Sequence, residues 1–328
     1  MSYLIRGVAA QGGIRIMGAD TTELVADACN RHQTSQTAGA ALGRTLTGAL
    51  LLCHVILKDH RDRVMVRLLG DGPLGGVIAD AGLDGVVRGY VNNPKVEIKA
   101  RKDGKLDVGG GVGKKGEIEV IRSHAPYGEP YSSSVKLTSG EVAEDITTFL
   151  GISEQVFSAV LLGVKFGCRG VDYSGGVLVQ VLPGAKTEDI ERIEENLLKL
   201  GQLTDAMSSM KIIEILHLIT CGLALEVITQ EALPLKFKCR CSHKKALDAL
   251  AYFPLEERQR MIIEDNGAEV SCHWCREVWW LNSEDIQSIN GEEIRCPDCR
   301  ALWYREGQSR MIRDNEVCAC GRRVALQS

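Results

Sequence analysis

The sequence predicts an α+β protein with a mixed helix and sheet core domain at its N-terminal end and a small, cysteine-rich zinc module near its C-terminal end. Three observations carry this prediction: helical periodicity in the first sixty residues, alternating apolar and polar residues in the middle of the chain, and the position of the cysteines. Of the twelve cysteines, eight lie after residue 238. The 328 residues can bury a sizeable core, and we expect a core domain plus a smaller module.

Composition narrows the classes of function. Apolar residues make up 45% and charged residues 25% of the chain, as in ordinary globular proteins. The longest apolar stretch, near Leu50 to Leu57, is too short to span a membrane, and no secretory signal opens the chain, so we expect a cytosolic protein without a membrane partner. A net charge of -4 provides no basic surface for nucleic acid. In a reducing compartment, clustered cysteines indicate metal binding or redox chemistry.

Both helices and strands are predicted in the core domain. A short strand is expected at Tyr3 to Ile5, then a helix capped by Thr21 or Thr22, then a helix over 37–57, so that the first sixty residues are helical after the opening strand. Asp84-Gly85 and Asp103-Gly104 are typical of hairpin turns. The expected strands share a period of two and lie at 64–68, 118–120, 135–137 and 177–181, with a helix over 141–149 between the last two. This core domain is predicted over residues 1–183.

A helical linker is predicted over residues 184–233. Pro183-Gly184 ends the core domain, and Thr187 followed by two acidic residues favours a helix start. A second helix is expected over 205–219. Each helix carries an apolar stripe, represented by Ile190, Ile193, Leu216 and Ile219. Periodicity alone favours burial of this stripe in a packed core.

The first cysteine cluster lies in a predicted zinc domain over residues 234–290. Cys239 and Cys241 form a C-x-C pair, and Cys272 and Cys275 form a C-x-x-C pair. Each pair can supply two thiolates from one tight turn, and two turns complete the tetrahedron that Zn²⁺ prefers. His243 and His273 are alternative ligands, but four sulfurs already saturate the ion, so we expect both to be exposed neighbours.

A second cluster lies in an extension over residues 291–328. The stretch 270–280 aligns with 294–304 at a constant offset of 24, which predicts an internal repeat of strand, cysteine turn and strand. The cysteines of this cluster are Cys296, Cys299, Cys318 and Cys320. Their spacing favours a second zinc site over a reserve of unbound redox thiols. The sequence leaves open which C-x-C pair shares a metal with which C-x-x-C pair.

The chemistry of the clusters excludes some functions and leaves two open. A Cys₄ site has no open position for substrate water, which argues against metal-dependent hydrolysis. Positive neighbours such as Arg240 and Arg276 favour thiolates, which oxidants attack, and loss of the metal would unfold a small zinc module. Most Cys₄ sites are nevertheless structural, so the residues alone favour a static site over a redox switch. The G-x-G-x-x-G match at 111–116 precedes a strand pattern instead of a helix, so no nucleotide site is expected.

The chain resembles the heat-shock protein 33 family of redox-regulated chaperones from Tyr3 to about Ile286. Besides the C-x-C and C-x-x-C pairs, the stretches that carry the resemblance are Thr21–Val25, Ala41–Thr47, Gly70–Gly76, Gly89–Val91, Lys105–Gly110, Glu129–Ser132, Ser139–Asp145 and Leu182–Ala185. So many stretches in the same order are highly specific. After about residue 290, where many members end, the sequence departs from the family.

The resemblance implies an ATP-independent holdase chaperone and not an enzyme. It implies that the reduced, zinc-bound form is inactive, and that oxidation pairs Cys239 with Cys241 and Cys272 with Cys275, releases zinc and unfolds the zinc domain with the linker. The linker stripe would then face unfolding client proteins, and oxidised chains would form homodimers. Two alternatives stay open: a static zinc ribbon that recognises nucleic acid or protein, and a thiol-disulfide oxidoreductase. The oxidoreductase requires a helix after its C-x-x-C pair, whereas residues 279–281 predict a strand.

Overall fold

The computed structural model describes residues 1–124, 129–228, 231–289, 293–295 and 302–304. The chain divides into two compact units, residues 1–239 and 240–328, each described here by itself. Both mix helices and strands, so the predicted α+β class is confirmed.

One sheet of the first unit contains the N-terminal strands. Its order is β10-β1-β2-β9-β8, and β11 also pairs with β1. The bounds are β1 Tyr3–Ala9, β2 Ile14–Asp20, β8 Ser158–Gly167, β9 Gly170–Val181, β10 Glu226–Val227 and β11 Leu233–Pro234. The helical expectation for the first sixty residues is therefore wrong over 14–20, and β8 was not predicted. Residues 16–19 of β2 are all buried, so both faces are covered and the alternation that identifies a half-buried strand is missing.

The second sheet has the order β12-β5-β4-β3-β6-β7. The bounds are β3 Arg63–Gly70, β4 Val77–Gly82, β5 Val86–Val91, β6 Gly116–Ser123, β7 Tyr131–Lys136 and β12 Lys236–Phe237. The hairpin turn at Asp84-Gly85 is confirmed, with Gly85 at a φ of 74°. The hairpin at Asp103-Gly104 is wrong: the Gly104 N–H donates to the Arg101 carbonyl in a turn that no strand flanks.

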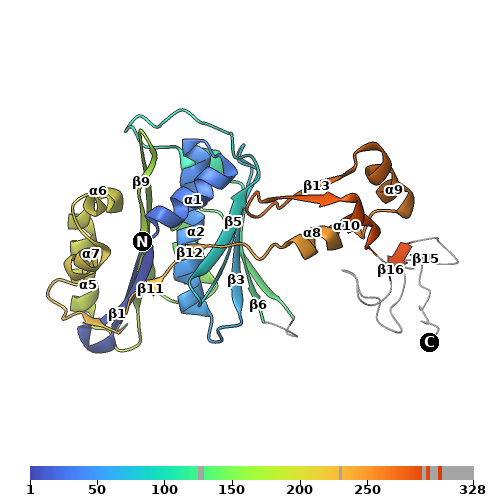
Figure 1. Cartoon of the computed structure of the whole chain (residues 1–328). Coiled ribbons are helices and arrows are strands. Elements are labelled where there is room, and N and C mark those ends of the chain that lie inside the picture. Colours follow the sequence, from blue (N-terminus) through green and yellow to red (C-terminus); the bar gives the residue numbers. More distant parts are fainter. Residues whose placement is uncertain (125–128, 229–230, 290–292, 296–301, 305–328) are drawn as a thin grey trace. The chain divides into compact units, whose positions relative to one another are not determined.

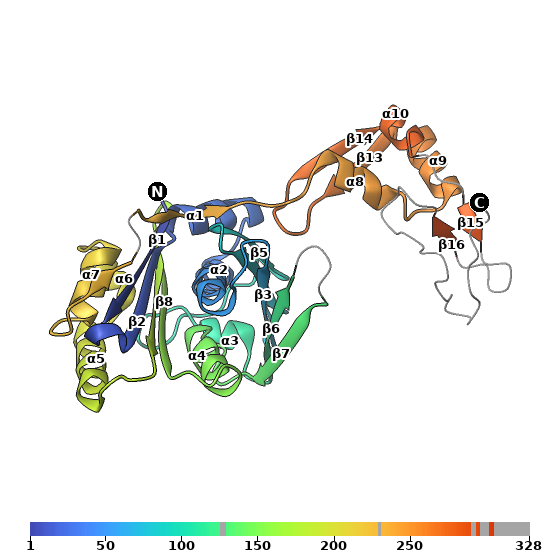
Figure 2. The ribbon, with the colours of Figure 1, turned by 90° about the horizontal axis from the view of Figure 1, so that it is seen from below.

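Helix α2, Gln36–Ile56, lies between the two sheets, with α1, Thr22–His32, beside it (Figures 1 and 2). The Ser35 side chain caps α2 by accepting from the Ala38 N–H. By length and composition α2 is the one helix of the described chain that could cross a membrane, but 83% of its most apolar window is buried inside the protein. Burial between two sheets explains why nearly every residue of α2 is apolar or small.

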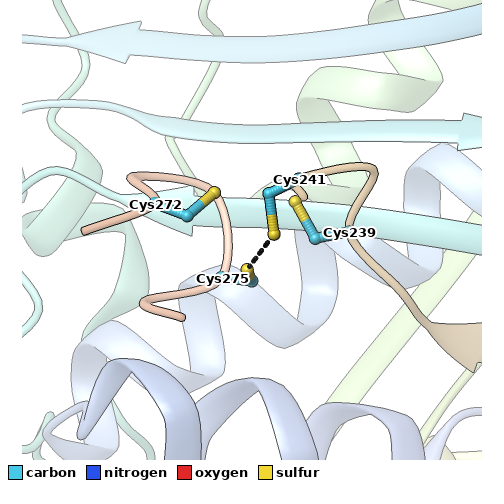
Figure 3. A group of neighbouring side chains, drawn as sticks. All are labelled: Cys239, Cys241, Cys272 and Cys275. Atoms are coloured by element: carbon cyan, nitrogen blue, oxygen red, sulfur yellow. Dashed lines mark hydrogen bonds between the residues drawn. The ribbon is translucent and has the colours of Figure 1, made fainter. Parts of the chain in front are cut away.

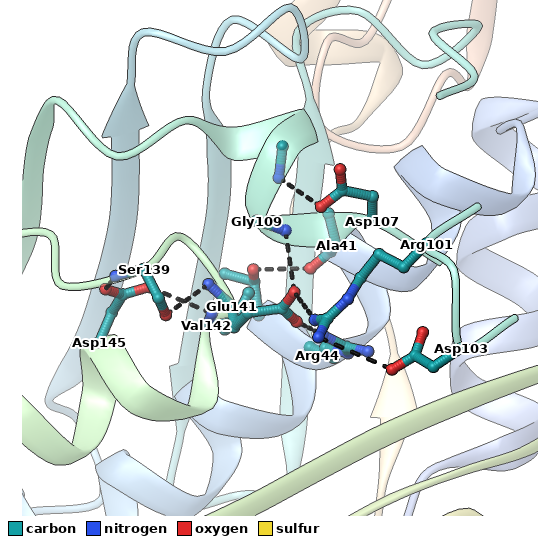
Figure 4. A network of polar contacts seen from close by, with 12 residues as sticks. Ala41, Arg44, Arg101, Asp103, Asp107, Gly109, Ser139, Glu141, Val142 and Asp145 are labelled. Atoms are coloured by element: carbon teal, nitrogen blue, oxygen red, sulfur yellow. Dashed lines mark hydrogen bonds and ion pairs between the residues drawn. The ribbon is translucent and has the colours of Figure 1, made fainter. Parts of the chain in front are cut away.

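A polar network ties α2 to the segments that cover its N-terminal half (Figure 4). Glu141 accepts from Arg44 at 2.5 Å, from Arg101 at 3.2 Å and from the backbone N–H of Gly109 at 3.3 Å. Gly109 belongs to the short helix α3, Val108–Val112, and Glu141 precedes α4, Ala143–Ile152. One carboxylate thus joins three segments that are distant in sequence.

The residue after Glu141 has a strained backbone. Val142 is fully buried with φ 62° and ψ -56°, and the Ala143 N–H donates to the Glu141 carbonyl across it, as in a tight γ-turn. Asp145 stabilises this conformation by accepting from the N–H groups of Thr138 at 2.7 Å and Val142 at 3.2 Å. The surrounding hydrogen bonds hold a conformation that is costly by itself.

The predicted linker packs on the face of the first sheet that is turned away from α2 (Figure 2). The helix from Thr187 is confirmed as α5, Thr187–Leu200, but the helix expected over 205–219 is two, α6 Leu203–Met207 and α7 Ile212–Ile219. The exposed fraction is 5% for Ile193 and 0% for Leu216 and Ile219, whereas Ile190 is half-buried. The apolar stripe is therefore core in this structure.

A buried asparagine that sequence reasoning missed joins two of these helices. Asn196 of α5 is 6% exposed, and its amide donates to the carbonyls of Ile219 at 2.9 Å and Cys221 at 3.1 Å, at the end of α7. Carbonyls at a helix C-terminus lack partners within the helix, so Asn196 satisfies two of them and fixes α5 against α7.

The second unit has a small apolar core. Its elements are α8 His243–Leu250, α9 Leu255–Glu264, β13 Gly267–Ser271, β14 Val278–Asn282, α10 Ser283–Gln287, β15 Glu293–Arg295 and β16 Leu302–Tyr304. The Ser242 side chain caps α8 by accepting from the Lys245 N–H. A main cluster of its buried apolar residues is Ala246, Leu250, Leu281 and Ile286. So few buried side chains supply little folding free energy without a cross-link or a metal.

The predicted strand repeat is confirmed in its strands. Val270 pairs with Trp279 in the hairpin of β13 and β14, and Ile294 pairs with Trp303 in the hairpin of β15 and β16. These two registers differ by the same offset of 24 that the sequence shows.

Candidate metal centre

Two tight segments present the four cysteines of the first cluster. Cys239 and Cys241 follow strand β12, and Cys272 and Cys275 lie in the turn between β13 and β14. Within that turn the Cys272 N–H donates to the Glu277 carbonyl and the Arg276 N–H donates to the Cys272 carbonyl, each at 2.8 Å. Arg276 has a φ of 59°, and this left-handed residue reverses the chain directly after Cys275.

The four sulfurs converge on one point (Figure 3). All four Sγ atoms lie within 4.8 Å of one another, and those of Cys241 and Cys275 are 3.5 Å apart. A tetrahedral zinc ion with Zn–S bonds of about 2.3 Å requires sulfurs about 3.8 Å apart. The 3.5 Å separation is also far beyond the roughly 2.05 Å of a disulfide bond. The donor set therefore fits Zn²⁺: Cys239, Cys241, Cys272 and Cys275 would hold the ion, as the sequence predicted.

Positively charged residues flank the cluster in the sequence. Cys275 is 3% exposed and the other three cysteines are half-buried, so water reaches the group only in part. The side chains of Arg240, Lys245 and Arg276 are exposed beside it, and the Lys245 ammonium donates to the Arg240 carbonyl at 2.8 Å. Positive charge close to a cysteine stabilises its ionised form, which binds metal and reacts with oxidants.

The neighbouring histidines lie outside the ligand group. His243 is 3.4 Å from an Asp285 oxygen and meets the Trp279 ring edge to face. His273 is exposed, and partial burial and the charge of Arg276 lower its pKa. Among the described residues, the group whose atoms converge contains cysteine alone.

The second cysteine cluster lies outside the described residues. Of this extension the structure describes β15 and β16, the two strands that flank Cys296 and Cys299 in the chain. The second zinc site therefore stays a prediction.

The remaining four cysteines divide into two kinds. Cys29 and Cys53 are buried, and burial raises the pKa of both thiols, that of Cys53 to about 12. They are packed small residues. Cys168 and Cys221 are exposed, although their apolar or glycine-rich sequence surroundings predict packed small residues as well. Each lies in a turn, after β8 and α7 respectively, where a glycine-rich sequence gave no indication of exposure.

Comparisons with known proteins point to one family. The protein-family model described as Hsp33 protein matches residues 2–282. A 33 kDa chaperonin of Thermus thermophilus is 46% identical over 337 aligned positions, which cover 100% of this chain and 98% of that protein. The 33 kDa chaperonin of Deinococcus radiodurans is 44% identical and covers 87% of this chain and 97% of its own length.

A solved structure gives the same fold. The crystal structure of the 33 kDa chaperonin (heat shock protein 33 homolog) of Thermotoga maritima superposes with a TM-score of 0.80 at 32% identity, covering 87% of this chain and 96% of that one. The family model ends after the four cysteines of the first cluster, and the Thermus relative aligns with the extension as well.

Proposed function

The chain belongs to the Hsp33 family, and on that premise we propose that it is a redox-regulated, ATP-independent holdase chaperone. Family membership assigns it a chaperone role. The holdase would bind unfolding or oxidatively damaged proteins and keep them from aggregating. The single observation that carries the redox part is the convergence of four cysteine sulfurs within 4.8 Å, three of them in a unit with a very small apolar core.

The resting form is proposed to hold one Zn²⁺ on Cys239, Cys241, Cys272 and Cys275. When bound, the ion links the segment after β12 to the turn between β13 and β14 and so supplies folding free energy that the small core lacks. For small zinc modules this contribution is on the order of 10 kcal/mol. The resting form is therefore ordered and inactive.

Oxidation is proposed to convert the four thiolates to two disulfides, Cys239 with Cys241 and Cys272 with Cys275. Each disulfide forms as two thiolates lose two electrons to one peroxide molecule, which takes up two protons per thiolate pair and leaves as two waters. A disulfide sulfur is a poor zinc ligand, so the ion passes to solvent. The sulfurs of Cys241 and Cys275, 3.5 Å apart, belong to different pairs, whereas each proposed disulfide joins two cysteines of one tight turn.

Loss of the metal is proposed to unfold the zinc domain together with the linker. Three residues of the apolar stripe, Ile193, Leu216 and Ile219, pack in the core on the first sheet. With the half-buried Ile190, they would then be available to unfolding clients. Oxidised chains would associate as homodimers. A reducing cytosol, where thiolates persist until an oxidant appears, is the compartment that fits such a device.

The extension is proposed to hold a second zinc ion on Cys296, Cys299, Cys318 and Cys320. Its support is the matched register of the two hairpins: if β15 and β16 repeat β13 and β14, the turn between them repeats the first C-x-x-C turn.

The two rival functions differ in what they predict. A thiol-disulfide oxidoreductase requires a helix after its C-x-x-C pair, whereas Cys275 is followed by strand β14. A static zinc ribbon would lose zinc under peroxide without gaining activity. We expect no nucleotide, nucleic acid or membrane partner and no catalytic turnover.

One titration tests the proposal. Peroxide with mild heat should release zinc, consume four thiols of the first cluster and suppress light scattering by an unfolding client, and a thiol reductant should reverse all three. Cys272→Ser should abolish zinc binding at the first cluster, whereas the matched control Cys221→Ser, an exposed cysteine outside it, should behave as the parent protein. Zinc release without suppression of scattering would refute the chaperone switch.

A further inference from the structure

The segment Leu233–Lys238 covers an edge of each sheet of the first unit. Its first residues form β11, in which Leu233 pairs with Leu4 of β1. Its next residues form β12, in which Phe237 pairs in parallel with Val87 of β5. An uncovered edge strand presents backbone N–H and C=O groups to any extended chain. In the resting protein this segment occupies those groups on β5.

The backbone bonds of the segment are independent of its side chains. The N–H groups of Leu235, Lys236 and Lys238 donate to the carbonyls of Ser2 at 2.9 Å, Gly85 at 3.0 Å and Val87 at 2.9 Å. Gly85 allows the close approach, since a Cβ there would lie 2.3 Å from the Pro234 carbonyl oxygen. The edge of β5 therefore binds the backbone of the segment at Gly85 and Val87.

The side chains of the segment alternate between burial and exposure. Leu235 is 4% and Phe237 is 9% exposed, whereas Lys236 and Lys238 point to solvent. The Phe237 ring meets the His32 ring of α1 edge to face, with centroids 6.3 Å apart. The site thus has two apolar positions, two residues apart, beside a row of backbone partners.

We propose that the edge of β5 is a client-binding site, and that Leu233–Lys238 occupies it as an internal substitute for a client. Lys238 directly precedes the zinc ligand Cys239, so loss of the metal frees one end of the segment. The vacated edge takes an extended, unfolded chain with apolar side chains at positions i and i+2, which adds to the sheet as a strand. The inference rests on the proposed holdase function and adds the class of client to it.

A peptide with the sequence of residues 231–238, EALPLKFK, tests the proposal on the full chain. Labelled with a fluorophore, it should bind the oxidised, zinc-free protein saturably and displace an unfolding client. It should not bind the reduced, zinc-bound protein. A control peptide with Leu235→Ser and Phe237→Ser should bind at least about tenfold more weakly, because it lacks both buried side chains. Equal binding of the two peptides would overturn the proposal.

The other outcomes are also decisive. If the oxidised protein suppresses client aggregation but binds neither peptide, the site is refuted and the holdase function stands. If the oxidised protein suppresses no aggregation, the proposed function fails and the site falls with it. If the peptide dissociates an oxidised dimer without displacing client, the edge holds a second copy of the chain, which also refutes a client site.

Hydrogen exchange gives an independent measurement at two neighbouring amides. Successive strand residues direct their backbone groups to opposite sides. Since the Val87 carbonyl faces β12, the Val87 N–H does too, and the N–H of Arg88 faces β4. The Val87 amide should lose protection on oxidation and regain it when client binds, while the Arg88 amide stays protected throughout. A Val87 amide that still exchanges freely with client bound would contradict the proposal.

Discussion

Truncation of one buried linker side chain should give the reduced, zinc-bound protein chaperone activity without oxidation. Leu216 on α7 is 0% exposed and packs against β2, where a Cβ added at Gly18 would lie 2.9 Å from its Cδ2 atom. Replacement of a fully buried leucine by alanine costs about 2 to 5 kcal/mol. Because every 1.4 kcal/mol is a factor of ten, the population with an unfolded linker should rise between about 30-fold and 4,000-fold.

The assay compares Leu216→Ala with Leu218→Ala, two residues away on the same helix and 40% exposed. Hydrogen exchange of the α7 amides should accelerate by that factor in Leu216→Ala and by less than about tenfold in the control. The reduced, zinc-bound Leu216→Ala protein should suppress client aggregation at a lower temperature than the parent. Faster exchange without earlier activity would show that linker release is not the step that exposes the client site.

Three further predictions concern other parts of the first unit. Asn196→Ala should lower the free energy of unfolding by about 1 to 3 kcal/mol, because one buried and one partly buried carbonyl lose their partner. Lys199→Ala, exposed on the same helix, should change it by less than about 0.5 kcal/mol in urea titrations. Alkylation at pH 8 followed by mass spectrometry should label Cys221 and spare Cys53, whose pKa is raised to about 12 by burial; equal labelling would contradict the burial. Burial and the charges of Arg6 and His60 lower the pKa of His54 from 6.5 to about 4. His54 therefore binds a proton more readily in the unfolded chain, so the free energy of unfolding should fall as the pH drops from about 6.5 towards 4, by at most about 3 kcal/mol. His54→Gln should flatten this dependence on pH.

Some helices and strands could be predicted from the sequence because a local pattern of apolar and polar residues identified each of them. In β3, Val64, Val66 and Leu68 alternate with less buried neighbours because the sheet buries one face fully. Strand β2 gave no such signal, since residues 16–19 are covered on both sides. The expected helix over 205–219 breaks between Met207 and Ile212, where a polar Ser-Ser pair interrupts a stripe that periodicity alone would continue.

The same distinction separates what could be predicted of the site. Two short cysteine spacings indicated all four residues of the first cluster, because each pair is formed within one turn and needs no knowledge of the fold. The hydrogen bonds of Asn196 to the end of α7, and the pairing of Leu233–Lys238 with β1 and β5, join residues that are far apart in sequence. Such pairings depend on where the tertiary structure places each partner, and two-residue strands carry no periodicity that could identify them.

The contacts of the segment that precedes Cys239 explain how loss of the metal would affect the first unit. The segment Leu233–Lys238 is held by at least three backbone hydrogen bonds, each worth about 1 kcal/mol net, and by the buried side chains of Leu235 and Phe237, at about 1.5 to 3 kcal/mol each. These sum to about 6 to 9 kcal/mol, before the entropy of ordering six residues, about 1 to 2 kcal/mol for each backbone, is subtracted. The ordering cost therefore offsets much of this gain. On the proposed function, the zinc site holds the C-terminal end of the segment, and its release lets a client chain compete for the edge.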